Sequence, residues 1–376
     1  MECREATMEN LGLDNLFGNI YKDRSVLVTG HTGFKGSWLS LWLKELGAKV
    51  IGYSLKPLST PNHFDLLKPA IVSIIGDIKD TKKLNKTVRT YKPEIVFHLA
   101  AQSLVRYSYK NPVETYETNV IGTVNVFEAC RNSKSVKAIL NITSDKCYEN
   151  REWVWGYREN DPMGGHDPYS ASKGCAELIT SSYRNSFFNL SGYLKTHNIL
   201  LASARAGNVI GGGDWAYDRL IPDIMRAVSK NEKVRIRNPK ATRPWQHVLE
   251  PLSGYLMLGQ RLLEGDREFA EGWNFGPGDE NSIDVETVIK NIKKRWNKIE
   301  YSIQKGVKNP HEANLLKLDC SKAHLKLKWI PNWDFEKTME VTVRWYKEFY
   351  ENGRIPSLDD LYEYIADSKN KRLKWV

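Results

Sequence analysis

Two stretches of the chain hold side chains whose spacing suits proton transfer. Ser144, Asp145 and Lys146 directly follow the apolar run 138–143, and Tyr169 and Lys173 stand four residues apart. In a helix, that spacing places a phenol and an ammonium on one face. A nearby cation can lower the pKa of a phenol, ordinarily about 10, so that Tyr169 could serve as a base. A surface Tyr/Lys pair and a Ser/Asp turn are the ordinary alternatives, and neither explains why both stretches occur together.

A third stretch predicts a cradle for a dinucleotide. Gly30, Gly33 and Gly36 follow the β-branched run 25–29 and open an amphipathic segment, 37–46. Glycine permits the tight turn and lets a diphosphate approach the free N–H groups of a helix N-terminus. Because a further strand-like run follows at 49–53, the glycines lie in a βαβ unit, which favours this reading over an ordinary glycine-rich turn.

The elements that position these residues alternate along the first half of the chain. The pattern predicts strands at 25–29, 49–53, 71–75, 95–99, 138–143 and 199–204, and helices at 37–46, 81–91, 113–131 and 170–188, with a loop at 56–67. This alternation predicts an α/β fold with a Rossmann-type doubly wound parallel sheet. Ser144 would then lie at the carboxyl end of a central strand, where ligands bind in such sheets.

The second half is less regular and predicts a smaller C-terminal substrate-binding lobe. We expect helices at 220–228, 252–263 and 285–296, a final helix at 335–350, and short strands at 234–236 and 245–248. We divide the chain into an N-terminal extension, 1–22, a dinucleotide-binding Rossmann domain that carries the catalytic residues, 23–207, and the lobe, 208–376, some of whose segments return to the Rossmann domain.

Composition limits the classes of function. The 376 residues carry a formal charge of +10, which suits an anionic partner such as nucleic acid, a membrane face or a phosphorylated small molecule. The lysines and arginines are spread along the chain, which indicates solvated surface and not a stripe for nucleic acid. No apolar run is long enough for a bilayer and the N-terminus lacks a leader pattern, so we expect a cytoplasmic protein that does not act on membranes. The five scattered cysteines predict reduced thiols and no metal site.

Together these stretches resemble the extended short-chain dehydrogenase/reductases, whose site combines Gly-x-x-Gly-x-x-Gly, a Ser or Thr after the fifth strand and Tyr-x-x-x-Lys. The resemblance continues through residues 98–102, 117–123, 205–211 and 319–323. Four further phrases, at 29–38, 144–150, 161–165 and 243–248, resemble the CDP-sugar 4,6-dehydratase branch. That branch has Asp-Lys after the hydroxyl, as in Asp145-Lys146, where the dTDP-sugar branch has Asp-Glu.

The resemblance implies a hydro-lyase that uses NAD to convert CDP-D-glucose to CDP-4-dehydro-6-deoxy-D-glucose. C4 would be oxidised, water lost across C5 and C6, and the hydride returned to C6. Tyr169 would take the 4-hydroxyl proton, Ser144 would hydrogen-bond that oxygen, Lys173 would hold the ribose and Asp145 would be the acid. Lys146 stands where related enzymes have a glutamate base, and an ammonium cannot accept a proton, so either a neutral Lys146 or another group must take the C5 proton.

The resemblance also implies the residues that bind the two ligands. NAD would be held by Gly30, Thr32, Gly33, Phe34, Lys35, Gly36, Asp77, Ile78, Leu99, Ala100, Ala101, Gln102, Asn119, Tyr169 and Lys173. The sugar nucleotide would meet Ser144, Asn208, Leu220, Ile221, Pro222, Arg235 and Arg243. The acidic residue that usually follows the second strand is absent from residues 53–56, so this position does not distinguish NAD from NADP.

Two other readings remain open at this point. One is a different sugar-nucleotide dehydratase, an epimerase or a decarboxylase on the same scaffold, although an epimerase does not need Asp145. The other is a non-catalytic dinucleotide-binding protein, which has no reason to keep Ser144, Tyr169 and Lys173 together. Helix 113–131 and the helix after Tyr169 resemble the pair that forms a dimer interface in the family, so we expect a homodimer or homotetramer.

Overall fold

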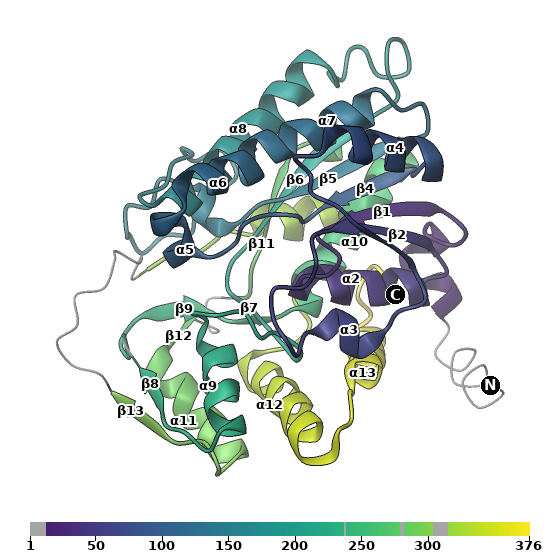
Figure 1. Cartoon of the computed structure of the whole chain (residues 1–376). Coiled ribbons are helices and arrows are strands. Elements are labelled where there is room, and N and C mark those ends of the chain that lie inside the picture. Colours follow the sequence, from purple (N-terminus) through teal and green to yellow (C-terminus); the bar gives the residue numbers. More distant parts are fainter. Residues whose placement is uncertain (1–12, 237, 279–281, 304–314) are drawn as a thin grey trace.

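The computed structural model describes residues 13–236, 238–278, 282–303 and 315–376, and a seven-stranded parallel sheet forms its centre (Figure 1). The strand order is β11-β6-β5-β4-β1-β2-β3, so the predicted Rossmann-type doubly wound sheet is confirmed. The order reverses between β1 and β4, which is the position where open α/β sheets bind ligands. The strands are β1 (Ser25–Thr29), β2 (Lys49–Ser54), β3 (Val72–Ile75), β4 (Ile95–His98), β5 (Ala138–Ile142), β6 (Leu200–Ala206) and β11 (Gly272–Phe275).

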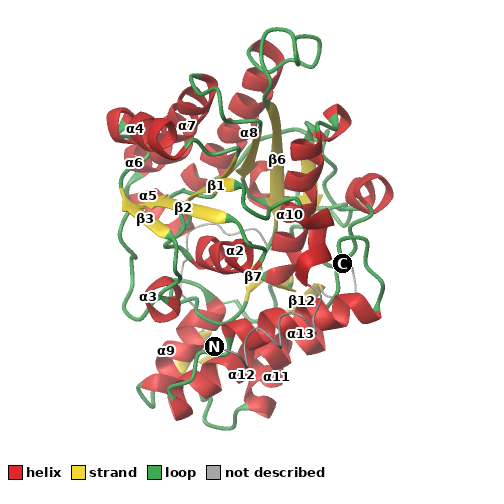
Figure 2. Ribbon diagram, turned by 90° about the vertical axis from the view of Figure 1, so that its right-hand side faces the viewer, coloured by secondary structure: helices red, strands yellow, loops and turns green. Residues whose placement is uncertain are grey.

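Helices cover both faces of the sheet. Figures 1 and 2 show α4 (Thr81–Tyr91), α7 (Gly122–Arg131) and α8 (Pro168–Ser186) on one face, and α2 (Phe34–Glu45) and α10 (Leu249–Glu264) on the other. Successive side chains of a strand point to opposite faces. In β1, accordingly, Val26 and Val28 join the apolar cluster under α2 and α10, whereas Leu27 joins the cluster under α4 and α7.

The helix expected at 113–131 is built from three consecutive pieces. These are α6 (Pro112–Tyr116), a π-helical turn (Glu117–Ile121) and α7. Turns of this kind interrupt helices mostly at functional sites. Here the turn contains Asn119, whose contacts are described below. Two short helices were not expected: α3 (His63–Leu67), within the predicted loop 56–67, and α5 (Val105–Lys110).

The second half contains the expected helices and more. Besides α10, the expected helices are α9 (Leu220–Ser229), α11 (Val285–Arg295) and α12 (Phe335–Asn352). The prediction that 335–350 is the last helix is wrong, because a further helix, α13 (Ser357–Asn370), follows it. Three small pairs of strands complete the lobe: β7 (Val209–Ile210) with β10 (Gln246–His247), β9 (Thr242–Pro244) with β12 (Ser282–Asp284), and β8 (Val234–Ile236) with β13 (Tyr301–Ile303). Strand β11 pairs with β6 at the edge of the central sheet.

The segment interpreted as an N-terminal extension, 1–22, packs into the core where the structure describes it. Its first twelve residues lie outside the described residues. Leu16, Phe17 and Tyr21 are buried, and the Tyr21 hydroxyl donates to the Leu256 carbonyl of α10 at 2.6 Å. The ring of Phe17 stacks on Trp375 with the centroids 5.1 Å apart. The domain boundaries at 22 and 207 stay predictions.

Candidate active site

The Ser-Asp-Lys stretch forms a short turn at the carboxyl end of β5. Ser144 begins a single 3-10 turn, Asp145–Cys147, and its Oγ accepts a hydrogen bond from the Lys146 N–H at 3.3 Å. The same hydroxyl donates to Asp145 Oδ1 at 2.8 Å, and both side chains are buried. The turn therefore holds a hydroxyl and a carboxyl side by side at the end of β5, the neighbour of β4, and so one strand away from the point where the strand order reverses.

Helix α8 brings Tyr169 and Lys173 to the same place. The helix begins sharply because Asp167 caps it, accepting from the Ser170 N–H at 3.0 Å, and because Pro168 occupies its first position. Lys173 Nζ lies 3.4 Å from the carbonyl oxygen of Ile142, the last residue of β5. Tyr169 is hydrogen-bonded with Ser144. The structure thus places four of the predicted catalytic residues in one buried group.

Burial controls the protonation of this group. Burial raises the pKa of Tyr169 to about 12, although the hydrogen bond with Ser144 and the charge of Arg219 act in the opposite direction. Burial lowers the pKa of Lys173 to about 8, against the charge of Glu177. Burial also raises the pKa of Asp145, opposed by Lys146, by the Ser144 hydrogen bond and by Lys35. The group therefore offers a carboxyl whose affinity for a proton is increased by burial, and a phenol that needs further positive charge before it can act as a base.

The glycine turn fits the diphosphate of a dinucleotide. Gly30 has a φ of 76°, and a Cβ there would lie 2.8 Å from the Ala100 nitrogen. A Cβ on Gly36 would lie 2.1 Å from the Gly30 oxygen, so only glycine lets the turn close this tightly. Helix α2 starts from Gly33 without a side-chain cap, which leaves its first N–H groups available to an anion.

The other residues expected around the cofactor mostly fix the backbone. Asn119 donates to the Gln102 carbonyl at 2.9 Å, accepts from the Gln102 N–H at 2.8 Å and donates to Ser172 Oγ at 2.8 Å. The π-helical turn thus ties the loop after β4, which contains Leu99, Ala100 and Ala101, to α8. The Ala100 N–H is itself held by the Thr29 hydroxyl at 3.2 Å. Gln102 and Asn119 consequently act as positioning residues for this loop.

Three more cofactor candidates have structural partners within the chain. The Thr32 hydroxyl donates to the Leu55 carbonyl at 2.9 Å and so holds the glycine turn against the end of β2. Asp77 Oδ1 accepts from the Lys79 N–H at 2.9 Å. Ile78 is buried and packs where a Cβ on Gly122 of α7 would stand, 2.4 Å from its Cδ1. Phe34 is half-buried at the start of α2.

The expected sugar-nucleotide residues lie in the second lobe at different depths. Ile221 and Pro222 are buried in α9, and Leu220 is half-buried against the core. Asn208 and Arg243 are half-buried, and the Asn208 carbonyl accepts from the Gln246 N–H at 3.3 Å. Arg235 is exposed in the middle of β8, opposite Ser302 of β13.

Sequence reasoning missed Arg219, which stands directly before the expected Leu220. Its guanidinium donates to Asp214 Oδ2 at 3.0 Å and to Ser103 Oγ at 3.1 Å, and so bridges the second lobe to the loop after β4. Its charge also acts on Tyr169 and on Lys35. Its place beside the Leu-Ile-Pro phrase was the available signal in the sequence, because its contact with Ser103 joins residues 116 positions apart.

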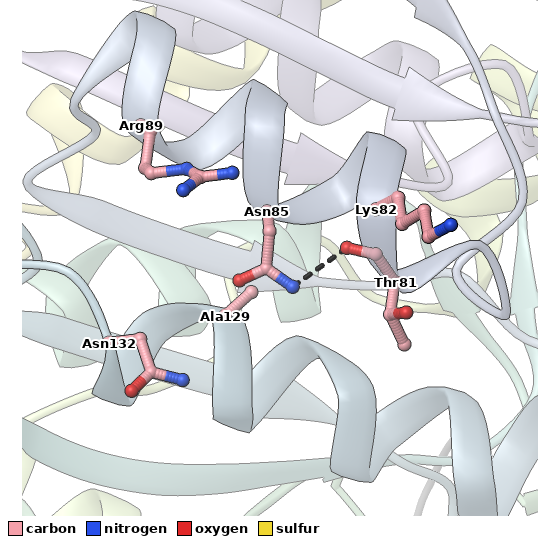
Figure 3. Close-up of a pocket in the computed structure, with 6 residues that line it drawn as sticks. All are labelled: Thr81, Lys82, Asn85, Arg89, Ala129 and Asn132. Carbon is pink, nitrogen blue, oxygen red and sulfur yellow. Dashed lines mark hydrogen bonds between the residues drawn. The ribbon is translucent and has the colours of Figure 1, made fainter.

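A hollow of about 370 Å³ lies elsewhere, between α4 and α7 (Figure 3), and is lined by Thr81, Lys82, Asn85, Arg89, Ala129 and Asn132. In the figure, Lys82 and Arg89 extend from α4, and Asn85 donates to the Thr81 carbonyl on the same helix. None of the predicted site residues lines this hollow.

Among the described residues there is no cluster of three His, Cys, Asp or Glu side chains that could hold a metal ion, and no helix with the length and apolar character of a membrane span.

Comparisons with known proteins agree with this geometry. A sequence model of the family described as GDP-mannose 4,6 dehydratase matches residues 27–342. A CDP-glucose 4,6-dehydratase of Salmonella typhimurium is 54% identical over 352 residues, which are 93% of this chain and 98% of that protein. A solved epimerase of Methanothermobacter thermautotrophicus has a TM-score of 0.78 and 26% identity, covering 90% of this chain and 96% of its own. A dTDP-glucose 4,6-dehydratase of Streptomyces venezuelae shares the fold, with a TM-score of 0.71, 22% identity, and coverage of 86% and 97%.

Proposed function

The chain belongs to the GDP-mannose 4,6 dehydratase family, and from this premise we propose that it is a hydro-lyase acting on CDP-D-glucose with NAD as cofactor. The product would be CDP-4-dehydro-6-deoxy-D-glucose. The observation that carries the proposal is the near-full-length likeness to a CDP-glucose enzyme, combined with Asp145 standing beside the Ser144, Tyr169 and Lys173 group. The carboxyl group is what a dehydration needs beyond an oxidation at C4.

The dinucleotide would be held by the glycine turn, whose shape fits a diphosphate, and by the loop after β4 that Asn119 fixes. When bound, NAD supplies a reversible acceptor for the hydride of C4. Lys56, which follows β2 where an acidic residue is usual, leaves NADP as an outcome that cofactor titration would reveal.

The chain's own residues perform the proton transfers. Tyr169 takes the 4-hydroxyl proton, and the charge of Arg219, which acts to lower the pKa of Tyr169, favours the phenolate. Lys173 lies one helical turn further along α8 and would add to that positive charge. Ser144 is bonded to both Tyr169 and Asp145, so it can orient the substrate oxygen between them. Asp145 is the acid that delivers a proton to the departing 6-hydroxyl, a role that burial favours because it raises the pKa of this carboxyl. The new 4-keto group acidifies C5, and this lets elimination proceed.

The second lobe would hold the nucleotide. A guanidinium matches a diphosphate in geometry, so Arg243 is the proposed diphosphate ligand, with Asn208 and Arg235 as helpers. Leu220, Ile221 and Pro222 would border the base. The choice of cytosine rests on the likeness to the CDP-glucose enzyme alone.

An epimerase is the second candidate, because a solved epimerase shares the fold at 26% identity. An epimerase oxidises C4 and reduces the same carbon, and so leaves the 6-hydroxyl in place. The two functions therefore differ in product, and Asp145 has a role only in the dehydration.

The test is to incubate the protein and NAD with CDP-glucose, dTDP-glucose, GDP-mannose and UDP-glucose and to identify products by mass and NMR. We expect loss of one water from CDP-glucose, with the other three converted at least tenfold more slowly. A product of unchanged mass would support the epimerase instead. No conversion of any of the four would contradict both functions.

We also propose that the protein works as a homo-oligomer in a reducing, cytoplasmic setting. Four described cysteines, Cys130, Cys147, Cys175 and Cys320, are free thiols, which suits a reducing compartment. Val113 of α6 and Leu178 of α8 are 69% and 60% exposed, which suits helices that pack against a second copy.

A further inference from the structure

Lys35 occupies an unusual place for a cation. It lies in the first turn of α2, half-buried, inside the glycine turn. The N-terminus of a helix carries partial positive charge, so an ammonium there is disfavoured. The Lys35 Nζ lies 6.0 Å from the ring centroid of Tyr255 on α10. The side chain therefore reaches across from the glycine turn toward the helix that underlies the end of β5.

The groups around Lys35 belong to the active site. Its amine interacts electrostatically with Asp145, Lys173 and Arg219, which come from three other segments of the chain. Burial and the two neighbouring cations lower its pKa to about 7, while Asp145 alone acts in the opposite direction. The lowered pKa favours the neutral amine, whose lone pair is available on the side of the site that contains the proposed acid.

Tyr255 provides a second observation. It is fully buried, and its hydroxyl has no hydrogen-bond partner among the described residues. Its phenol also interacts electrostatically with Asp145 and Tyr169. A buried hydroxyl without a partner requires an explanation, and a bound molecule that extends into this corner of the site supplies one. Lys35 and Tyr255 thus lie together where a substrate's reacting end would be.

We propose that Lys35 is the base that takes the C5 proton during dehydration, an inference that rests on the proposed function. The neutral Nζ accepts the proton from C5, and the electrons of that C–H bond form an enolate with the 4-keto group. The enolate then expels the 6-hydroxyl, which leaves as water with the proton of Asp145. When the hydride returns to C6, the Lys35 ammonium gives its proton back to C5 and becomes the neutral amine again. The proton that Tyr169 took from the 4-hydroxyl then passes through the Ser144 hydroxyl to Asp145, which restores both the phenolate and the acid.

Lys146 then acts only through its charge. It lies next to Asp145, and its charge lowers the pKa of that carboxyl, opposing the effect of burial. This keeps Asp145 within reach of proton release during elimination. The division of roles explains how the chain can work without the glutamate of related enzymes: the base comes from the glycine turn instead of the β5 end.

The test separates C4 oxidation from C5 deprotonation in single turnovers with CDP-glucose and saturating NAD in D2O. Reduced cofactor is followed by absorbance, and deuterium at C5 is measured by NMR. We expect Lys35→Met to form reduced cofactor but to lose C5 exchange by roughly 10²–10⁴-fold, the usual contribution of a general base. Lys35→Arg keeps a cation but cannot become neutral, so it should lose exchange equally. Lys44→Met changes an exposed lysine in the last turn of the same helix, so it is the matched control and should exchange at the wild-type rate. Lys146→Met tests the alternative base and should retain C5 exchange, although more slowly because the acid loses a neighbouring charge.

Other outcomes overturn the proposal. Exchange at the native rate in Lys35→Met, or exchange lost in Lys146→Met and retained in Lys35→Arg, removes Lys35 as the base. If a tenfold higher NAD concentration restores the C5 exchange rate of the variant, Lys35 serves cofactor binding. The affinity for NAD is measured independently by titration with tryptophan fluorescence as the signal. Should Lys35→Met fail to fold, Lys35→Arg carries the test. If the wild-type protein does not oxidise CDP-glucose, the proposed function itself is contradicted. A Lys35 variant that still oxidises C4 but does not exchange the C5 proton supports the role of Lys35 as the base.

Discussion

Single side chains in this site work through buried charges that balance one another. Glu177 lies one helical turn after Lys173 and is completely surrounded by donors. It accepts from Arg205 at 2.8 Å, from Ser203 at 2.7 Å and from Thr143. Although burial would raise the pKa of Glu177, Arg205 and these hydroxyls hold it below its usual range. The resulting negative charge raises the pKa of Lys173 and so keeps that amine protonated near neutral pH.

Replacing Glu177 with Gln should therefore change the pH dependence of catalysis. Without the negative charge the pKa of Lys173 falls below about 8, so the alkaline limb of kcat/KM should move to lower pH by roughly one unit. The variant also leaves the Arg205 charge buried without its carboxylate, although the Tyr148 hydroxyl and the Glu159 carbonyl still accept from it, and we expect a cost of about 3–5 kcal/mol in unfolding free energy. Urea denaturation and a pH–rate profile measure the two effects.

The double variant Glu177→Gln/Arg205→Met is the control for that experiment. It removes both buried charges, so it should recover part of the lost stability while the pH limb stays displaced. An alkaline limb that does not move in the single variant would mean that Glu177 serves packing and not the charge of Lys173.

At the scale of elements, His63 joins three helices that are far apart in sequence. Its Nδ1 is bonded to Ser37 of α2 and its Nε2 to Ser357 of α13, both at 2.7 Å, and its ring stacks on Trp38. Burial lowers the pKa of His63 to about 3, below the value of about 6.5 in an unfolded chain. The unfolded state thus binds a proton that the folded state rejects, and the stabilising contribution of His63 is present above pH 6.5 and lost as pH falls.

His63→Gln should consequently destabilise the protein at pH 7.5 and much less at pH 5. The difference in unfolding free energy between wild type and variant should shrink by about 1.4 kcal/mol per pH unit below pH 6.5. Urea unfolding at four pH values measures this slope. A difference that stays constant over the range would contradict a neutral, buried His63.

The glycine turn is the second element whose behaviour can be predicted. In Gly36→Ala the new Cβ would lie 2.1 Å from a backbone oxygen, so the turn must open, and NAD binding should weaken by at least tenfold. Gly33→Ala is the matched control, since its Cβ would lie 3.3 Å from the same oxygen. Without cofactor, the melting temperature should fall more in Gly36→Ala than in Gly33→Ala. Equal losses for both variants would show that the tight turn is not what Gly36 provides.

For the whole molecule, the exposed apolar side chains of α6, the π-helical turn and α8 predict assembly. Val113, Ile121 and Leu178 are 69%, 53% and 60% exposed. Val113→Glu/Leu178→Glu should convert the oligomer to a monomer in light scattering, because burying two unpaired charges opposes association. Leu58→Glu is the control, since Leu58 is 88% exposed outside these helices and its replacement should leave the mass unchanged. A wild-type protein that is monomeric at micromolar concentration would contradict the prediction.

The sequence by itself determined the strands and the longer helices of the nucleotide-binding half, because each strand there is a short apolar run, whereas the short helices α3 and α5 were not expected. Gly30, Gly33 and Gly36, the Ser144 stretch and the Tyr169/Lys173 pair were visible for the same reason: each is a pattern within eight residues. Strand β11 was missed because Gly272 and Asn274 break its apolar pattern. The extended conformation of this segment is stabilised by pairing with β6 and by burial under α10, neither of which is visible in the local sequence.

Only the tertiary structure decided which distant groups share the site and how they are charged. Arg219 contacts Ser103, 116 positions away, and Glu177 contacts Arg205, 28 positions away. Lys35 interacts electrostatically with Asp145, which lies more than 100 positions further along the chain. No local pattern encodes such contacts, since they arise when separate helices pack on one sheet. Protonation follows from the same packing, because removal from water shifts the pKa of a lysine or an aspartate by an amount that its residue type does not reveal. The sequence thus names the chemical groups, and the fold sets which of them hold a proton.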